Sequence, residues 1–225
     1  MTFPRQSLTL ITPDDIEPVA KATIEQIRPK LYAQQRILWL VSGGSAVYVA
    51  IEAIDKLNCD LSGLSVGLID ERYGEPGHSD SNYRALSEAG FDGSILEIEP
   101  VITGQSVSES AVLYSLWLND QLDESDFTLG LFGIGADGHT AGLLPDNPIN
   151  DSAQLYDHFQ ADDYLRLSAT PKLIRRLDAA VVYAVGDSKW PVLQRLFTDE
   201  DNNLPANVLS RIDDLRVFSD VKLDI

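Results

Sequence analysis

The chain has 225 residues, of which 17 are Lys or Arg and 35 are Asp or Glu, so its formal net charge at pH 7 is −18. The hydrophobic fraction of 44% is typical of a folded protein and excludes a disordered chain. The acidic composition excludes a general basic surface for nucleic acid and a polybasic membrane patch. An anionic ligand would therefore depend on a few local cations that act against the overall charge.

The single cysteine, Cys59, excludes a disulfide framework and a thiolate metal site within one chain. The three histidines are scattered, so no metal site is predicted either. Residues 1–10 lack the apolar core of a signal peptide, and the longest apolar run, residues 179–185, is too short to span a membrane. We expect a cytoplasmic protein that folds as a single domain over residues 1–225.

Short apolar runs alternate with segments of helical periodicity along the chain. In chain order, the pattern predicts a strand at Ile37–Val41, a helix at Ala46–Leu57, a strand at Leu64–Ile69, a helix at Ser108–Leu122, strands at Phe127–Phe132 and Tyr164–Leu167, a helix from Pro171 to about Leu177, a strand at Ala179–Val185, a helix at Ser188–Phe197 and a last strand at Leu215–Phe218. This alternation predicts a Rossmann-like α/β fold, with a central, mostly parallel sheet and helices on both faces. Ligands of such folds bind at the carboxyl ends of the strands.

The first predicted strand is followed by Ser42, Gly43, Gly44 and Ser45, and then by a helix. The two glycines allow a tight turn and close approach of the backbone to a ligand, and amides at a helix N-terminus favour an anion. The spacing and the missing Gly-Lys-Ser/Thr ending exclude a Walker A loop. The segment predicts a phosphate site, and the alternative is an ordinary turn between strand and helix.

Three charged residues, Asp70, Glu71 and Arg72, follow the second predicted strand. Carboxylates in this place can hold sugar hydroxyls or steer protons, and an arginine can bind a phosphate or carboxylate through two hydrogen bonds. The alternative is a surface cluster with internal ion pairs. His78, in the loop that continues from these residues, is expected to be exposed or structural and not catalytic.

Residues 133–138, which follow the third predicted strand, formally match the dinucleotide motif GxGxxG. In that motif a long helix follows and shields a pyrophosphate. Here Asp137 places a negative charge inside the motif, and Pro145 and Pro148 soon interrupt the following segment. A dinucleotide site is therefore rejected.

A better interpretation of this loop concerns Asp137 and His139. Glycines such as Gly135 bring the backbone close to a ligand, and histidine is the side chain most easily poised as a general base near neutral pH. Asp137, two residues earlier, can shape the turn or orient the imidazole. The alternative is a structural histidine.

Two more cations are candidates for binding an anion. Lys189 lies in the first turn of a predicted helix, where the helix dipole disfavours a cation unless it serves a bound anion. Arg166 lies in or near the start of the fourth predicted strand. For both residues the alternative is an ordinary surface charge.

Taken together, these loops resemble those of the glucosamine-6-phosphate isomerase/6-phosphogluconolactonase family, and most closely its lactonase branch. The resemblance runs from about residue 36 to residue 209, and its most specific part is Asp-Gly-His-Thr-Ala at residues 137–141. The matching segments are Ser42–Ser45, Asp70–Arg72, Ser81–Tyr83, Gly133–Ala141, Leu143–Pro145, Arg166–Ser168, Gly186–Lys189 and Leu204–Ala206.

This resemblance implies an α/β fold, no metal or cofactor, and hydrolysis of 6-phospho-D-glucono-1,5-lactone to 6-phosphogluconate in the oxidative pentose phosphate pathway. It matches His139 to the catalytic histidine, and Arg72 and Lys189 to residues that hold the phosphate. It places the Ser42–Ser45 loop in the same pocket. The expected partner is a small phosphosugar lactone, and the expected state is a monomer or a weak homodimer.

Two alternatives stay open. Glucosamine-6-phosphate deaminases share the Asp-Gly-His core but carry another acid seven residues after its aspartate, where this chain has Leu144. They also lack an arginine at the position of Arg72. The second alternative is a sugar-phosphate-binding module without catalysis, and the presence of both His139 and Asp137 argues against it, since a sensor needs no base.

Overall fold

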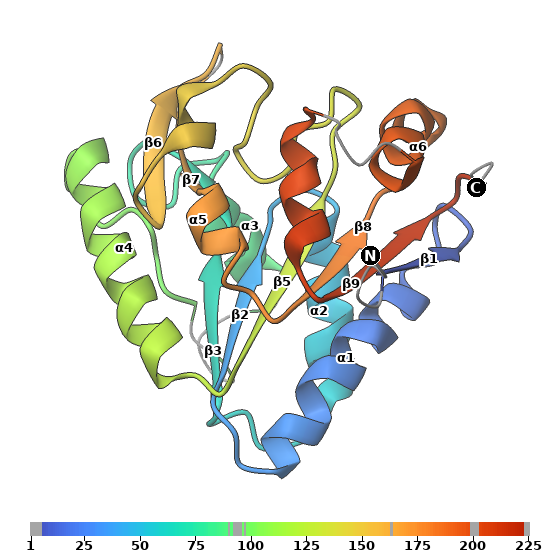
Figure 1. Ribbon diagram of the computed structural model, residues 1–225. Coiled ribbons are helices and arrows are strands. Elements are labelled where there is room, and N and C mark those ends of the chain that lie inside the picture. The colour runs from blue at the N-terminus through green and yellow to red at the C-terminus, as the bar shows by residue number, and fades with distance from the viewer. Residues whose placement is uncertain are drawn as a thin grey trace.

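A central parallel sheet organises the computed structural model, which describes residues 6–89, 91, 96, 98–162, 164–198 and 203–222 (Figure 1). Within these residues the sheet has six strands in the order β1-β9-β8-β5-β2-β3. Their bounds are β1 Gln6–Leu10, β2 Ile37–Val41, β3 Leu64–Leu68, β5 Phe127–Gly133, β8 Ala179–Tyr183 and β9 Asp214–Ser219. Every pairing between these strands is parallel, so the predicted α/β fold with a mostly parallel sheet is confirmed.

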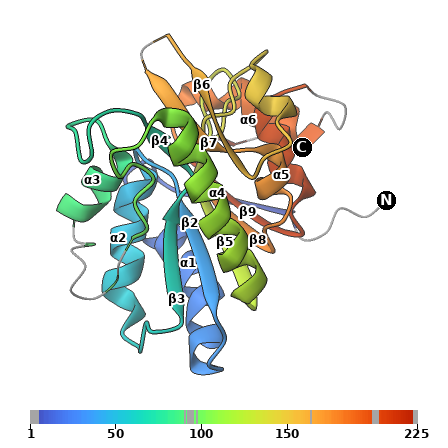
Figure 2. The same ribbon diagram turned by 90° about the vertical axis from the view of Figure 1, so that its left-hand side faces the viewer.

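Helices cover both faces of this sheet (Figures 1 and 2). Helices α1 (Glu17–Tyr32) and α2 (Ala46–Leu57) pack against each other on one face, and α4 (Val107–Glu124) and α5 (Pro171–Ile174) lie on the other. The remaining helical segments are α3 (Asn82–Glu88), α6 (Trp190–Thr198) and the 3₁₀ turns η1 (Pro148–Asp151), η2 (Asp187–Lys189) and η3 (Pro205–Arg211). No helix in the described part of the chain is both long and apolar enough to cross a membrane.

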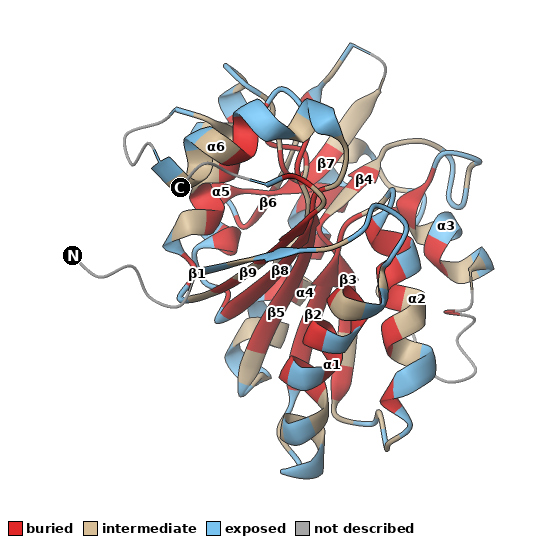
Figure 3. Cartoon of the chain, turned by 90° about the vertical axis from the view of Figure 1, so that its right-hand side faces the viewer, coloured by how far each residue is buried: buried red, intermediate tan, exposed pale blue. Residues whose placement is uncertain are grey.

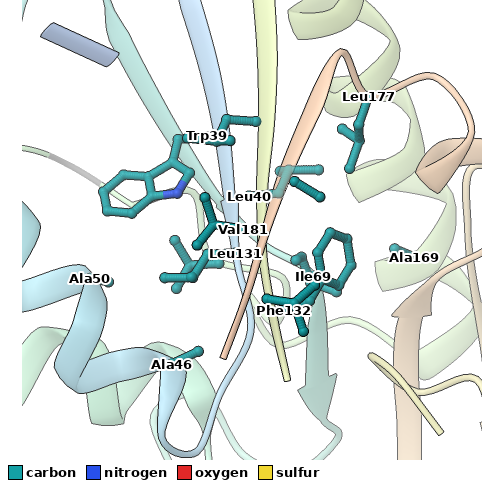
Figure 4. Packing of buried hydrophobic residues seen from close by; sticks show 14 of the residues in the cluster. Trp39, Leu40, Ala46, Ala50, Ile69, Leu131, Phe132, Ala169, Leu177 and Val181 are labelled. Atoms are coloured by element: carbon teal, nitrogen blue, oxygen red, sulfur yellow. The ribbon is translucent and has the colours of Figure 1, made fainter. Parts of the chain in front are cut away.

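The central strands are apolar on both faces because both faces are covered. All five residues of β2 are buried, and buried residues run along the neighbouring strands (Figure 3). Successive side chains of a strand point to opposite faces. Trp39 and Leu131 accordingly lie on the side of Ala50 in α2, whereas Leu40 and Phe132 lie on the opposite side of the sheet (Figure 4). Burial on both sides keeps the strands in register and fixes the loops that follow them.

A second, antiparallel sheet stands beside the carboxyl edge of the first. Its order is β4-β7-β6, with β4 at Asp70–Arg72, β7 at Leu165–Ala169 and β6 at Tyr156–Gln160. Two expectations were therefore wrong: the strand predicted at Tyr164–Leu167 does not belong to the parallel sheet, and Asp70–Arg72 is not loop. One residue separates β3 from β4, which leaves no room for a helical crossover, so β4 leaves the first sheet and pairs with β7.

The sheet order determines where a ligand can bind. β2 and β5 are neighbours at the centre of the sheet, but the chain continues from β2 to β3 on one side and from β5 to β8 on the other. The loops that leave β2 and β5 therefore diverge and open a crevice between them. This topological switch point is where open α/β sheets bind their ligands.

Candidate active site

An open cleft with an empty volume of about 680 Å³ lies at this switch point. Its lining contains the predicted site residues Ser42, Gly43, Gly44, Ser45, Asp70, Arg72, Gly135, His139, Arg166 and Lys189. The loops after β2, β5 and β8 and the strands β4 and β7 bring these residues together. Of the predicted set, Asp137 lies behind His139 and Glu71 lies away from the cleft.

His139 and Asp137 form a hydrogen-bonded pair at the cleft. Nδ1 of His139 lies 2.6 Å from Oδ1 of Asp137, which also accepts the backbone N–H of His139 at 3.1 Å. Burial raises the pKa of Asp137, but the hydrogen bonds from His139 and its charge outweigh this effect and lower that pKa below its ordinary value. The carboxylate therefore holds the ring proton on Nδ1. Nε2, which makes no hydrogen bond to any described residue, is left with its lone pair.

Gly135 is what allows the imidazole to take this position. A Cβ atom at residue 135 would lie 2.1 Å from Nδ1 of His139 and 2.6 Å from Oδ1 of Asp137. The backbone N–H of Gly135 donates to the carbonyl of His139 at 2.8 Å and closes the loop. After residue 138 the chain forms turns until Pro148, so the long helix that follows the glycines in the dinucleotide motif is not formed here.

The Ser42–Ser45 loop offers hydrogen-bonding groups that no described residue uses. Ser42 is 6% exposed, and its buried Oγ has no hydrogen-bond partner within the described residues. A buried hydroxyl without a partner is costly, which indicates that a ligand completes its bonding. Ser45 precedes the first turn of α2 and makes no side-chain capping bond, so its hydroxyl and the backbone N–H of Ala46 remain available to an anion, whereas the N–H of Val47 donates to the carbonyl of Gly44.

Two arginines lie side by side on neighbouring strands of the small sheet. Arg72 of β4 and Arg166 of β7 are directly paired in the antiparallel register, and both line the cleft. Like charges in this arrangement destabilise a sheet unless something neutralises them. Asp70 contributes one negative charge, although burial and the charge of Glu71 raise its pKa against the opposing effect of both arginines. With Lys189, the cleft gathers three cations in a strongly acidic chain, which favours an anionic ligand.

Glu71 has a different environment from its two neighbours. Its side chain is 1% exposed, and its carboxylate accepts hydrogen bonds from Oγ of Ser81 and from the backbone N–H groups of Arg72, Asn82 and Tyr83, all between 2.7 and 2.9 Å. Since successive strand residues point to opposite sides, Asp70 and Arg72 reach the cleft while Glu71 points away from it. Its contacts are with the N-terminus of α3 and not with the cleft.

Asn82 is a cleft residue that the sequence analysis included in a matching segment, Ser81–Tyr83, but to which it assigned no role. Its side-chain amide donates to the backbone carbonyl of Asp70 at 2.8 Å and to the carboxylate of Asp70 at 3.3 Å. Its other side lies against Gly43, where a Cβ atom would come within 2.0 Å of Oδ1 of Asn82. Its place in that matching segment, directly after Ser81, which caps α3, was the available signal. Gly133, Ile134 and Ala141 complete the lining.

Comparison with known proteins places this chain in a family. A family model described as glucosamine-6-phosphate isomerases/6-phosphogluconolactonase matches residues 14–217. The chain is 31% identical over 170 residues to a 6-phosphogluconolactonase of Synechocystis sp., and the match covers 71% of each chain. It is 27% identical over 186 residues to a 6-phosphogluconolactonase of Bos taurus, which covers 74% of this chain and 70% of the relative.

Solved structures share the fold at lower sequence identity. A 6-phosphogluconolactonase from Shewanella baltica superposes with a TM-score of 0.80 at 19% identity, covering 96% of this chain and 97% of the other. A 6-phosphogluconolactonase from Trypanosoma brucei gives 0.73 at 20% identity, covering 96% of both chains. On the family model and the relatives, this chain belongs to the glucosamine-6-phosphate isomerase/6-phosphogluconolactonase family.

Proposed function

We propose that the protein hydrolyses 6-phospho-D-glucono-1,5-lactone to 6-phosphogluconate. The observation that carries this proposal is the His139–Asp137 pair, which presents Nε2 to a cleft containing Arg72, Arg166 and Lys189. A base beside a cluster of cations suits an ester-like substrate that carries a phosphate. The lactonases among the relatives support this substrate. The single cysteine is consistent with work in a reducing, cytoplasmic compartment.

The proposed reaction uses His139 twice. Nε2 takes a proton from a water molecule as its oxygen forms a bond to the lactone carbonyl carbon, which gives a tetrahedral oxyanion. The bond between this carbon and the ring oxygen then breaks, and the imidazolium returns the proton to the ring oxygen, which becomes a hydroxyl group. Asp137 stabilises the imidazolium between the two steps.

The other cleft residues stabilise the oxyanion and bind the phosphate and the sugar hydroxyls. The oxyanion needs donors that are already in place, and the loop amides supply them in this proposal. The phosphate is held by Arg72, Arg166, Lys189 and the hydroxyl groups of the Ser42–Ser45 loop. The carboxylate of Asp70 accepts hydrogen bonds from sugar hydroxyls, and Asn82 orients it.

The test is lactone hydrolysis by the purified protein. The lactone is generated in the cuvette by glucose-6-phosphate dehydrogenase, and its loss is compared with the spontaneous rate. Acceleration that is proportional to protein concentration is expected. Binding of 6-phosphogluconate without acceleration would favour a binding module, and ammonia released from glucosamine 6-phosphate would favour the deaminase.

Gly43 provides a geometric prediction for this cleft. Gly43→Ala is expected to weaken 6-phosphogluconate binding by a factor of about ten or more, because the new Cβ displaces Asn82 and with it the support of Asp70. Gly44→Ala is the matched control. There φ is +65°, which costs roughly 1 kcal/mol of backbone strain, but the new Cβ meets no described atom within 4 Å. Calorimetric titration would contradict the prediction if both variants bound alike.

A further inference from the structure

The loop between β4 and α3 contains a histidine that the proposed reaction does not use. Nε2 of His78 lies 2.8 Å from the backbone carbonyl of Arg72, and Nδ1 lies 3.3 Å from the backbone nitrogen of Asp80. A carbonyl can only accept a hydrogen bond and a backbone N–H can only donate one. Both contacts are therefore satisfied by one state of the ring, a neutral imidazole with its proton on Nε2 and its lone pair on Nδ1.

This ring connects the two ends of the segment that holds the guanidinium of Arg72. Nη1 of Arg72 donates to the backbone carbonyl of Asp80 at 3.0 Å. Asp80 therefore accepts a hydrogen bond from the side chain of Arg72 through its backbone carbonyl and donates one to His78 through its backbone N–H. His78 thus fixes both the backbone from which the arginine side chain starts and the residue at which the side chain is held.

Neighbouring groups keep the His78 ring in place. The ring of Tyr164 stacks on it, with centroids 6.2 Å apart and an interplanar angle of 25°, and the hydroxyl group of Tyr164 donates to the carboxylate of Asp80. A Cβ at Gly74 would lie 2.7 Å from Cδ2 of His78, so glycine is needed for this close contact. The half-buried ring of His78 thus has two hydrogen bonds and a stacking contact that fix its orientation. A histidine exposed in a loop would have none of these contacts.

We propose that His78 is a positioning residue that holds Arg72 ready for the anionic ligand of the cleft. An arginine that is free in solution loses about 2 kcal/mol of side-chain entropy when it is fixed. Anchoring it beforehand transfers that cost from binding to folding, so the ligand binds more tightly. The inference rests on the proposed phosphosugar function, and it assigns to His78 an effect on binding that is larger than its effect on the chemical step.

The experiment compares His78→Phe, which keeps the stacking but loses both polar contacts, with His78→Gln, whose amide nitrogen can still donate to the carbonyl of Arg72. His78→Phe is expected to raise KM for the lactone and Kd for 6-phosphogluconate about tenfold, with kcat changed less than about threefold. His78→Gln is expected to stay within about threefold of the wild type. His158→Phe, which removes a half-buried histidine from β6, is the matched control and leaves KM unchanged.

A double-mutant cycle tests whether His78 acts through Arg72. In an Arg72→Met background, His78→Phe is expected to change Kd less than twofold, because no guanidinium is left to position. Loss of affinity of the same size in both backgrounds would overturn the proposal, as would a His78→Gln variant as impaired as His78→Phe.

A readout without ligand separates this inference from the proposed function. ¹⁵N relaxation of Nε in Arg72 is expected to show an ordered side chain in the wild type and an order parameter below about 0.6 in His78→Phe. An unchanged order parameter overturns the positioning role even where the lactone is hydrolysed. A fall in this parameter, with no hydrolysis by the wild type, supports the positioning role while the proposed function fails.

Discussion

Replacement of His139 by glutamine is expected to lower kcat for lactone hydrolysis by a factor of about 10² to 10⁴, the usual contribution of a general acid–base group. Glutamine has a similar length but cannot take a proton from water at neutral pH. KM is expected to change only a few-fold, because the cations that hold the phosphate remain. The midpoint of thermal unfolding is expected to stay within about 2 °C, since the side chain is 40% exposed and its side-chain bond is to Asp137.

Asp137→Asn is the companion variant for this prediction. It keeps the shape of the loop but removes the charge that stabilises the imidazolium, so an intermediate loss of about ten- to a hundredfold in kcat is expected. The coupled assay must subtract spontaneous hydrolysis, which sets its lower limit. A His139→Gln enzyme that retained near-normal turnover would exclude His139 as the base and direct attention to Asp70.

The second large effect is on stability and concerns Glu71. Glu71→Ala is expected to lower the free energy of unfolding by about 3 to 5 kcal/mol, because it leaves buried N–H groups at the start of α3 without an acceptor. In a protein of this size each kcal/mol corresponds to roughly 2 to 4 °C in the unfolding midpoint, so a fall on the order of 10 °C is expected. Urea unfolding monitored by circular dichroism measures the change.

A nearby glutamate provides the control. Glu75 lies exposed in the loop after β4, so Glu75→Ala is expected to change the free energy of unfolding by less than about 0.5 kcal/mol. If Glu71→Ala unfolded at the same urea concentration as Glu75→Ala, the buried carboxylate would not be the anchor of α3. Glu71→Gln keeps one acceptor oxygen, so its free energy of unfolding is expected to lie between those of Glu71→Ala and Glu75→Ala.

The segment Asp70–Arg72 shows how far the sequence could predict the site. The three charges after an apolar strand predicted a place near a ligand, because charges do not belong in the interior of a parallel sheet, and two of them, Asp70 and Arg72, line the cleft. Treated as a loop, they gave no reason to separate Glu71 from its neighbours. In a strand, successive side chains point to opposite sides, so Glu71 points away from Asp70 and Arg72. A strand of only three charged residues has no apolar pattern from which it could be predicted.

The central strands were predictable because, unlike β4, they have a clear apolar pattern. Ile37–Val41 and Phe127–Gly133 are buried on both faces, so each forms a continuous apolar run that is visible in the sequence. Strand β1, by contrast, lies at the edge of the sheet, carries an exposed Leu10 and has too little apolar pattern to be recognised. Strand β6 was missed because its five residues include only two aromatic ones, Tyr156 and Phe159, which lie three positions apart and so do not show the alternation of a strand.

The position of β9 has a consequence for how the chain folds. β9 lies between β1 and β8, so Gln6–Leu10 finds its partner only when Asp214–Ser219 is available. On the ribosome, β1 is therefore made long before its partner, and the chain as far as β9 must emerge before that edge of the sheet closes. Such distant pairing slows folding and leaves the edge of β8 open in the meantime. The high negative charge of the nascent chain then helps to keep these open edges from associating with one another.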